Sequence, residues 1–261
     1  MAELIRTEIH QHTLEITFDR PKERNAFNVE MLQQLANAFT QLEDNPELRV
    51  AVILAAGKHF TLGLDLEDVA AHMRKHRSYP IHGENIVDPW AIVGRERKKP
   101  VIVAAHGFCF TLGIELMLAS EIRLAAPSTR FAQMEVQRGI MPFGGATIRM
   151  PREFGWGNAM RYLLTGDVFS AEEALRLGLV QEIVEQDRLR ERALELAGRV
   201  AAQAPLAVQA TLANARLGAR EGLAAAAERL LKITTELMDT EDAEEGVRSF
   251  VEKRAAQFKG R

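Results

Sequence analysis

The chain has 261 residues, of which 47% are hydrophobic and 26% are charged, and its 33 Lys and Arg against 36 Asp and Glu give a net charge of -3. This composition is typical of a globular protein and excludes a collagen-like fibre, a coiled-coil rod and a disordered tail. No excess of positive charge favours nucleic acid or an anionic membrane as a partner. The single cysteine, Cys109, permits no intrachain disulfide, so we expect a reducing, cytoplasmic location.

Two stretches of the sequence bear on targeting and on membrane insertion. The first twenty residues carry scattered charges and lack a charged head followed by an apolar run, so we expect no signal peptide. The apolar stretch 101–119 contains His106, Glu115 and two glycines. A carboxylate near the centre of a bilayer is costly, so this stretch predicts a buried core segment and no membrane span.

Strand and helix patterns alternate along the first two thirds of the chain. Alternating apolar residues predict a half-buried strand over 12–18. Short apolar runs predict further strands at 50–56, 101–105, 122–126 and 180–184. Asn28 is the expected cap of a helix that stops at 45–46, and Ser170 with Glu173 forms a capping box for a helix over 171–177. This alternation predicts an α/β fold.

Strand patterns end near residue 187. Segments rich in Ala, Leu, Glu and Arg then predict helices at 187–203, 205–217, 221–238 and 241–258. We therefore divide the chain into an α/β core at 1–186, which holds the candidate site, and a helical C-terminal region at 187–261. The last helix carries an apolar stripe that must pack on its own core or on a neighbouring subunit, formed by Val247, Phe250, Val251 and Phe258.

The sequence contains none of several common catalytic motifs: no nucleophile elbow, Walker phosphate loop, dinucleotide-binding glycine motif, C-x-x-C or H-E-x-x-H. Asp68, His72 and His76 would align on one helix, as zinc ligands can, but the cations within 74–77 oppose a divalent ion, so we expect no metal. Cys109 is interpreted as a small hydrophobic residue. Residues 72–99 are the least regular part, and we expect a mobile loop or a frayed helix there.

Two glutamates are candidates for chemistry. Glu115 is surrounded by apolar residues, and Glu135 comes just before the glycine-rich stretch 139–145. Taken singly, Glu115 is compatible with a structural carboxylate and Glu135 with a surface loop. Two strand-loop-helix junctions, at 60–65 and 108–115, offer free backbone N–H groups that stabilise developing negative charge. The combination favours a catalytic interpretation.

The sequence resembles the crotonase family of enoyl-CoA hydratases and isomerases over nearly its whole length. Residues 20–28 resemble the family's first loop, Phe60-Thr-Leu-Gly-Leu-Asp65 its F-x-A-G-x-D motif, and 107–115 the segment that opens its central helix. Glu135 falls in what is usually Q-P-E, and 139–149 is similar to G-x-x-P-G-x-G-G-x-x-R. Later matches lie at 164–167, 174–180 and 250–254. The order and spacing of these motifs carry the resemblance.

The resemblance implies a fold and a set of site residues. The fold is the crotonase (ClpP-like) spiral of β-β-α turns, with a C-terminal helical region that packs subunits into a homotrimer or homohexamer. Leu64 and Leu112 fall at the two positions whose backbone N–H groups form the oxyanion hole. Glu115 and Glu135 fall on the two catalytic glutamates, 20 residues apart as in the family. The matched motifs assign substrate and CoA binding to Lys22, Arg24, Ala26, Gly63, Asp65 and Leu66.

The implied activity is that of an enoyl-CoA hydratase, which adds water syn across an α,β-unsaturated acyl-CoA thioester, or the reverse dehydration. Glu115 is assigned as the base that activates water, because the first turn of a helix favours a carboxylate, and Glu135 as the acid that protonates Cα. No cofactor is expected, since CoA is part of the substrate. Isomerisation, decarboxylation or thioester hydrolysis in the same site, or CoA binding without catalysis, are the alternatives.

The sequence also departs from the family pattern. Larger residues stand where the family has small ones or glycine, at Leu62, Leu64, Thr111, Leu112 and Phe143, and Met134 stands where it has proline. We expect this bulk to narrow or reshape the acyl pocket. A positive φ at residue 112 would strain a leucine there.

Overall fold

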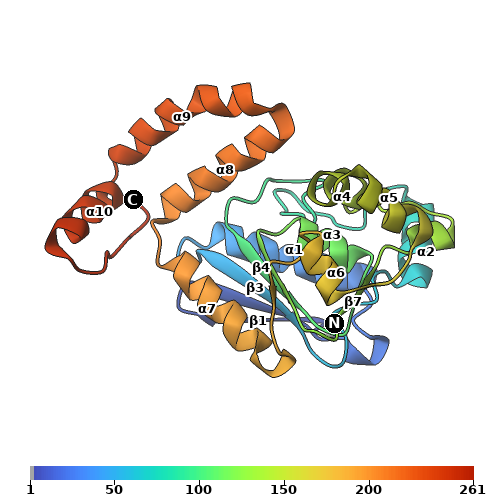
Figure 1. Cartoon of the computed structure of the whole chain (residues 1–261). Helices are drawn as coiled ribbons and strands as arrows, with labels where there is room; N and C mark the ends of the chain where they lie inside the picture. Colours follow the sequence, from blue (N-terminus) through green and yellow to red (C-terminus); the bar gives the residue numbers. More distant parts are fainter. Residues whose placement is uncertain (1–2) are drawn as a thin grey trace.

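The computed structural model describes residues 3–261 and has a central sheet with helices on both faces (Figure 1). The sheet has six strands in the order β1-β2-β3-β4-β6-β9. Their bounds are β1 (Ile5–His10), β2 (Thr13–Phe18), β3 (Val50–Ala55), β4 (Val101–Ala105), β6 (Ile122–Ala125) and β9 (Glu182–Ile183). All neighbours are parallel except β1 and β2. The sequence missed β1 because only Ile5 of that strand is buried, which leaves no apolar alternation.

The helices follow the expected pattern. Their bounds are α1 (Val29–Asp44), α2 (Leu66–His76), α3 (Leu112–Leu118), α4 (Ala146–Phe154), α5 (Trp156–Thr165), α6 (Ala171–Arg176), α7 (Leu189–Ala201), α8 (Pro205–Glu221), α9 (Leu223–Met238) and α10 (Glu241–Glu252). Asn28 caps α1 by accepting a hydrogen bond from the Met31 N–H at 2.9 Å. Only half of the expected capping box forms: Ser170 accepts from the Glu173 N–H, but the Glu173 carboxylate pairs with Tyr162 and Arg176.

The central strands are apolar on both faces because helices cover both. On β3, Ile53 packs into the larger core, which includes side chains of α1 and α3. Its neighbours Val52 and Leu54 point the other way and pack with Leu189 and Ala193 of α7. Continuous apolar runs such as 50–55 are typical of strands buried on two sides.

A second layer of strands runs beside the main sheet. It contains β5 (Phe108–Phe110) and β7 (Arg130–Ala132), which are parallel, and β8 (Phe169–Ser170), which is antiparallel to β7. Parallel bridges join Phe27 to Leu64 and Thr61 to Cys109. Successive turns of the chain therefore stack on one another in the expected spiral, and this stacking brings loops far apart in sequence to one place.

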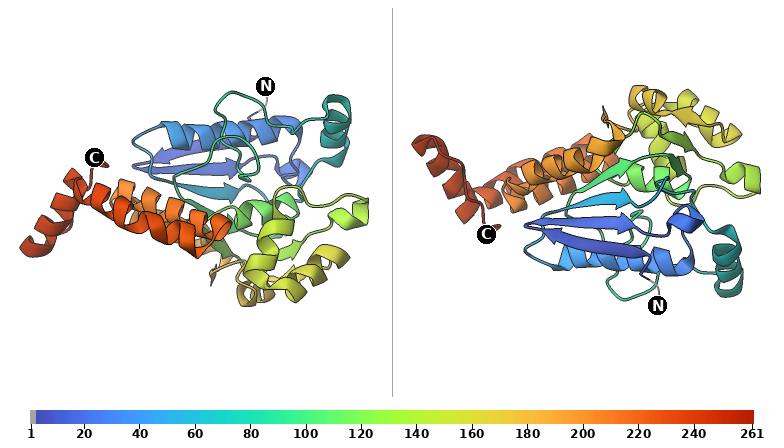
Figure 2. Two further views of the ribbon diagram at one scale, coloured as in Figure 1. Left: turned by 90° about the horizontal axis from the view of Figure 1, so that it is seen from above. Right: turned by 90° about the horizontal axis from the view of Figure 1, so that it is seen from below.

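The C-terminal helices divide into two groups. Helix α7 packs on the main sheet, whereas α8, α9 and α10 form an arm that extends away from the core (Figures 1 and 2). Arg216, in the C-terminal half of α8, ties this helix to Glu121 of the core at 2.7 Å. Helix α10 ends at Glu252, earlier than expected, because Lys253 takes a left-handed conformation with φ 53°. Within residues 3–261, no helix is long and apolar enough to cross a membrane.

The segment 72–99, expected to be a mobile loop or a frayed helix, divides in two: residues 72–76 form the end of α2, and 77–99 have no helix or strand. The stretches 82–85 and 91–94 are exposed, but residues between them anchor the segment in the core. The Trp90 side chain is fully buried, and Asp88 is 2% exposed. The Asp88 carboxylate accepts hydrogen bonds from the backbone N–H groups of Trp90, Ile92 and Val93. These bonds fix the segment without a helix or strand.

Candidate active site

The two loops expected to form an oxyanion hole end at the starts of α2 and α3. Leu64 pairs with Phe27 in a parallel bridge, in which Phe27 donates to Gly63 O at 2.7 Å and accepts from the Asp65 N–H at 2.9 Å. The N–H of Leu64 itself points away from that partner. Within the described residues, neither the Leu64 N–H nor the Leu112 N–H makes a hydrogen bond, so both donors are available to a ligand.

Buried side chains hold the first of these loops in shape. The Thr61 hydroxyl donates to Asn25 O at 2.6 Å and accepts from the Gly63 N–H at 3.0 Å. Asn25 in turn donates to the carbonyls of Ala56 and His59. These bonds satisfy the backbone of the loop, so the Leu64 amide is held in place before any ligand arrives.

Backbone strain near the second loop lies at Thr111, which corrects the expectation for Leu112. Thr111 has φ 50° and ψ -112°, a conformation that costs a threonine about 1–3 kcal/mol. Leu112 itself does not have a positive φ. The α3 helix begins directly after Thr111.

Glu115 is 1% exposed and lies in the first turn of α3. Its Oε1 accepts a hydrogen bond from the Ala146 N–H at 2.9 Å. A Cβ atom on Gly144 would lie 2.8 Å from Glu115 Oε2 and 2.9 Å from both Leu112 and Trp90, so only glycine leaves room for the carboxylate. Burial raises the pKa of Glu115 to about 8, and the Glu135 charge adds to this rise.

Glu135 begins the short 3-10 helix Glu135–Arg138, three residues after the end of β7, and is 6% exposed. Its Oε1 accepts from Gln133 at 3.3 Å, and its buried Oε2 has no hydrogen-bond partner within residues 3–261. Burial raises its pKa to about 7. Neither glutamate is ion-paired with a described residue, so near neutral pH the pair readily keeps one proton.

A pocket of about 260 Å³ opens over Glu135. Its lining is mostly apolar and consists of Leu62, Leu64, Leu66, Phe110, Thr111, Met134, Glu135, Arg138 and Ile140. Four of the residues noted for their bulk, Leu62, Leu64, Thr111 and Met134, therefore do line it. Phe143 instead contacts the Tyr79 ring, with centroids 6.0 Å apart. The sequence analysis missed Phe110, Arg138 and Ile140.

Segment 77–99 contacts residues of the candidate site through Trp90, and no pattern in the sequence indicated this contact. The Trp90 indole N–H donates at 2.9 Å to the carbonyl of Leu112, the residue whose N–H is the second expected oxyanion donor. Arg149 of α4 donates to Trp90 O at 2.8 Å and to Gly144 O at 3.0 Å. Arg149 thus joins this segment to Gly144, which leaves room for Glu115.

The residues expected to bind substrate or CoA occupy different surroundings. Leu66 lines the pocket, and Gly63 lies against Thr111. Asp65 accepts from Arg20 at 2.9 Å and precedes α2. Lys22 and Arg24 are exposed, and Ala26 accepts from Arg20 through its carbonyl. Apart from Leu66, these residues do not line the pocket, and their CoA contacts stay a prediction.

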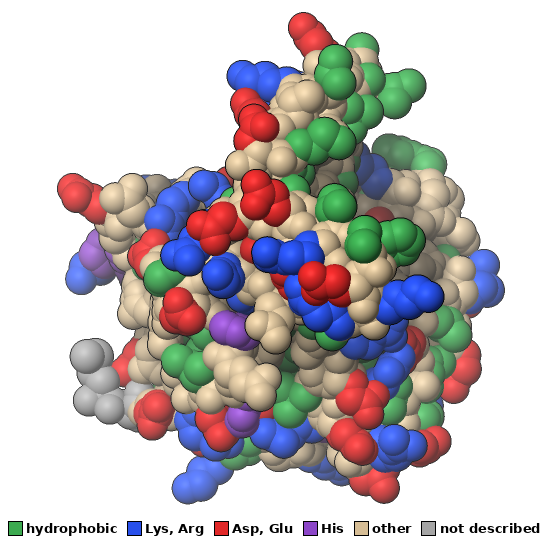
Figure 3. Space-filling view, turned by 90° about the vertical axis from the view of Figure 1, so that its left-hand side faces the viewer, with side chains coloured by type: hydrophobic (Ala, Val, Ile, Leu, Met, Phe, Trp, Pro, Cys, Tyr) green, Lys and Arg blue, Asp and Glu red, His purple; other side chains and the backbone are tan. Residues whose placement is uncertain are grey.

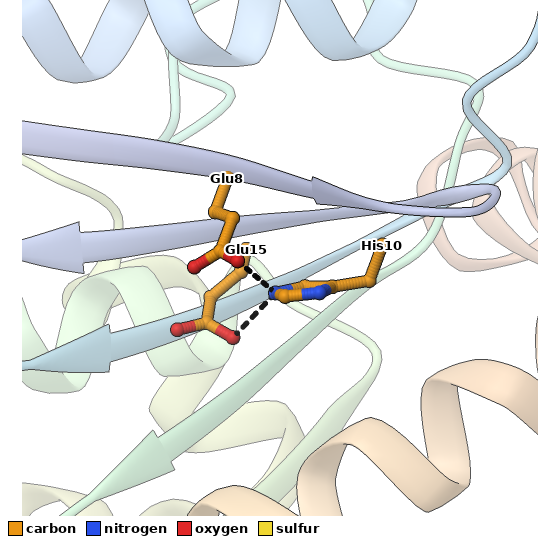
Figure 4. Close-up of side chains that lie close together, drawn as sticks. All are labelled: Glu8, His10 and Glu15. Atoms are coloured by element: carbon orange, nitrogen blue, oxygen red, sulfur yellow. Dashed lines mark ion pairs between the residues drawn. The ribbon is translucent and has the colours of Figure 1, made fainter.

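Other clusters of possible metal ligands lie outside the pocket. Asp68 accepts from the Val29 N–H at 2.8 Å and so supports the start of α1. On the β1–β2 hairpin, His10 lies 3.6 Å from Glu8 and 3.2 Å from Glu15 (Figure 4). Arg190 of α7 already pairs with Glu15 at 2.9 Å, and this cation opposes a metal ion at the same carboxylate.

Comparison with known proteins identifies the family. The family model for enoyl-CoA hydratase/isomerase matches residues 8–261, and the chain belongs to this family. An enoyl-CoA hydratase of Mycobacterium tuberculosis is 34% identical, with 96% of this chain and 94% of that protein covered. A carnitinyl-CoA dehydratase of Salmonella typhi is 36% identical, with 95% of each covered.

The solved structures agree with this assignment. The crystal structure of a probable enoyl-CoA hydratase/isomerase from Mycobacterium abscessus superposes with a TM-score of 0.95, at 49% identity and with 99% of each chain covered. The expected crotonase fold is confirmed. The resemblance seen in the motifs is confirmed with it.

Proposed function

We propose that the protein is an enoyl-CoA hydratase that adds water across an α,β-unsaturated acyl-CoA thioester, or catalyses the reverse dehydration. One observation carries this proposal: the buried Glu135 lines a pocket together with Leu64, whose backbone N–H is free within the described residues, and a second buried glutamate, Glu115, lies close enough for the Glu135 charge to raise its pKa. Relatives named as a hydratase and as a dehydratase support both directions.

The proposed reaction moves two protons and adds one water. Water oxygen bonds to Cβ as Glu115 takes a proton from that water, and the electron pair of the double bond moves toward the thioester oxygen. The Leu64 and Leu112 N–H groups stabilise the negative charge on this oxygen. Glu135 then protonates Cα and restores the thioester. The glutamates end with the same number of protons, held on the opposite residue.

The pKa values bear on how this cycle begins. Burial raises the pKa of both glutamates, and the Glu135 charge raises that of Glu115 further, so the pair shares a proton near neutral pH. Burial therefore acts against the effect of the helix start, on which the assignment of Glu115 as the base relied. With the proton on Glu135 the pair is ready for hydration, and with the proton on Glu115 it is ready for dehydration.

The first test is a panel of short, branched and aromatic enoyl-CoA thioesters. We expect loss of the conjugated-enoyl absorbance and a product heavier by one water, and the relative rates rank the acyl groups. A product of unchanged mass with a moved double bond identifies an isomerase. Loss of carbon dioxide or release of free CoA identifies a decarboxylase or a thioesterase.

We also propose that the arm assembles the protein into a homotrimer or a homohexamer. Large apolar side chains are exposed on α9 and α10, and Figure 3 shows hydrophobic groups gathered on the projecting part of the molecule. They are Leu223, Leu230, Leu231, Met238, Val247, Phe250 and Val251. Exposed apolar surface of this extent is typical of an interface. The mass in solution, measured for the wild type and for Leu231→Glu with Phe250→Glu, tests this assembly.

A further inference from the structure

The Thr111 side chain lies between the two loops that are expected to form the oxyanion hole. A Cβ atom on Gly63 would lie only 1.7 Å from Thr111 Oγ1, so this hydroxyl lies directly against the residue before Leu64. Thr111 also precedes Leu112, the second donor, and lines the pocket above Glu135. The hydroxyl thus belongs to the residue before one donor and lies against the residue before the other.

This hydroxyl is buried and unpaired. Thr111 Oγ1 has no hydrogen-bond partner within residues 3–261. Two fully buried threonines provide a comparison: Thr61 donates to Asn25 O at 2.6 Å and Thr129 to Ala105 O at 3.1 Å. A buried hydroxyl without a partner costs about 1–3 kcal/mol unless a ligand or water satisfies it. Within residues 3–261 nothing uses this donor, so it is left for a ligand that comes within reach of it.

The backbone holds the hydroxyl in this position despite strain. The Thr111 N–H donates to Ala132 O at 2.9 Å, and Thr111 O accepts from the Glu115 N–H at 3.1 Å, which fixes the peptide units on both sides. With ψ -112°, the Cα–Cβ bond turns to the same side as the Leu112 nitrogen. Glycine would adopt this conformation without strain, so the threonine side chain requires a reason.

We propose that the Thr111 hydroxyl is a third donor of the oxyanion hole and hydrogen-bonds the thioester oxygen as negative charge develops there. This inference rests on the proposed function, because it assigns a role within the same site. Preorganised donors act strongly in a site that excludes water. The pocket's apolar lining favours such an effect here.

Three substitutions separate the hydroxyl from the shape of its side chain. Thr111→Val keeps the shape and removes the donor, and we expect kcat to fall about 10- to 100-fold with little change in KM, less than the loss of a backbone donor. Thr111→Ser keeps the donor and should stay within about threefold of wild type. Thr111→Gly relieves the strain that the positive φ causes, so it should raise the melting temperature. It also removes the hydroxyl, so it should lower kcat as the valine variant does.

A second measurement does not depend on water addition. The substrate analogue 3-oxobutanoyl-CoA has an acidic Cα proton, and its enolate places negative charge on the thioester oxygen and absorbs in the ultraviolet. We expect bound analogue to ionise at a pH about one to two units higher in Thr111→Val than in wild type, the same 10- to 100-fold effect. This result in a protein that hydrates no enoyl-CoA would support the third donor and overturn the hydratase assignment.

Two outcomes would overturn the role of Thr111. In the first, Thr111→Val matches wild type in kcat and in the pH at which the analogue ionises. In the second, Thr111→Gly gains both stability and activity, which would mean that the threonine only crowds the oxyanion hole.

Discussion

The active site and the C-terminal arm each bury a glutamate, and the two carboxylates have opposite surroundings. Glu115 is 1% exposed and accepts one hydrogen bond from the Ala146 backbone. Glu245 of α10 is 7% exposed, but Arg248 and Arg254 both donate to it at 2.9 Å. Hydrogen bonds from Arg254 hold the pKa of Glu245 well below its usual range, whereas burial raises that of Glu115 to about 8.

The comparison separates a carboxylate that can exchange a proton from one that stabilises the fold. Around Glu245, two guanidinium groups keep the charged form at every ordinary pH. Around Glu115, Arg149 bonds to the carbonyls of Trp90 and Gly144 and makes no ion pair with the glutamate. In the candidate site, arginine therefore bonds to backbone carbonyls and leaves the two glutamates without a counter-charge among the described residues, which suits groups that titrate near neutral pH.

The largest expected effect is on catalysis. Glu115→Gln and Glu135→Gln keep the side-chain shape and remove the proton exchange, so each should lower kcat for hydration about 10²- to 10⁴-fold. Steady-state kinetics with the best enoyl-CoA of the panel measure this loss, and melting temperatures confirm that both variants fold. Full activity in either variant would remove that glutamate from the proposed reaction.

Glu245→Gln should lower the stability of the protein and leave its catalysis unchanged. The substitution leaves Arg248 and Arg254 without their counter-charge, so we expect a lower melting temperature and an unchanged kcat at moderate temperature. Because the folded pKa of Glu245 is lowered, its charge stabilises the protein above the ordinary value of 4.5. The difference in stability from wild type should therefore shrink as the pH falls below that value. A large loss of kcat with unchanged stability would contradict this contrast.

Glu115→Gln should show the opposite pH dependence of stability. The folded pKa of Glu115 is raised, so between pH 4.5 and about 8 the folded protein holds a proton that the unfolded chain has lost. Wild-type stability should fall by about 1.4 kcal/mol per pH unit across this window relative to the variant. Denaturant unfolding of both proteins at several pH values measures the slope. Parallel curves would show that Glu115 titrates normally.

Much of the frame could be predicted because its signals are local. Apolar runs identified β3 and β4, and Asn28 marked the start of α1. The resemblance in the motifs singled out the glutamate pair and the two loops expected to form the oxyanion hole, and their roles stay a prediction. The expected helix over 241–258 was too long, because the left-handed turn at Lys253 has no glycine to announce it.

The missing parts depend on contacts between distant residues. Segment 77–99 has no periodic pattern, and its role became visible only when Trp90 was found against Leu112, 22 residues away. The strain at Thr111 likewise depends on Ala132, which fixes the Thr111 peptide from β7. Long-range packing sets the backbone φ of Thr111 and leaves its hydroxyl unpaired, and no local pattern in the sequence reveals such packing.

The smallest expected effect tests whether this distant segment positions the oxyanion loop. Trp90→Phe removes the indole donor to Leu112 O and retains an aromatic ring in the buried site, so we expect a loss of about 1–2 kcal/mol in the free energy of unfolding and a few-fold fall in kcat. The ring should keep its edge contact with Phe27, whose centroid lies 5.6 Å away. Lower stability with an unchanged kcat would mean that Trp90 supports only the core. A fall in kcat in Trp90→Phe would show that the hydrogen bond from Trp90 to Leu112 O positions this loop for catalysis.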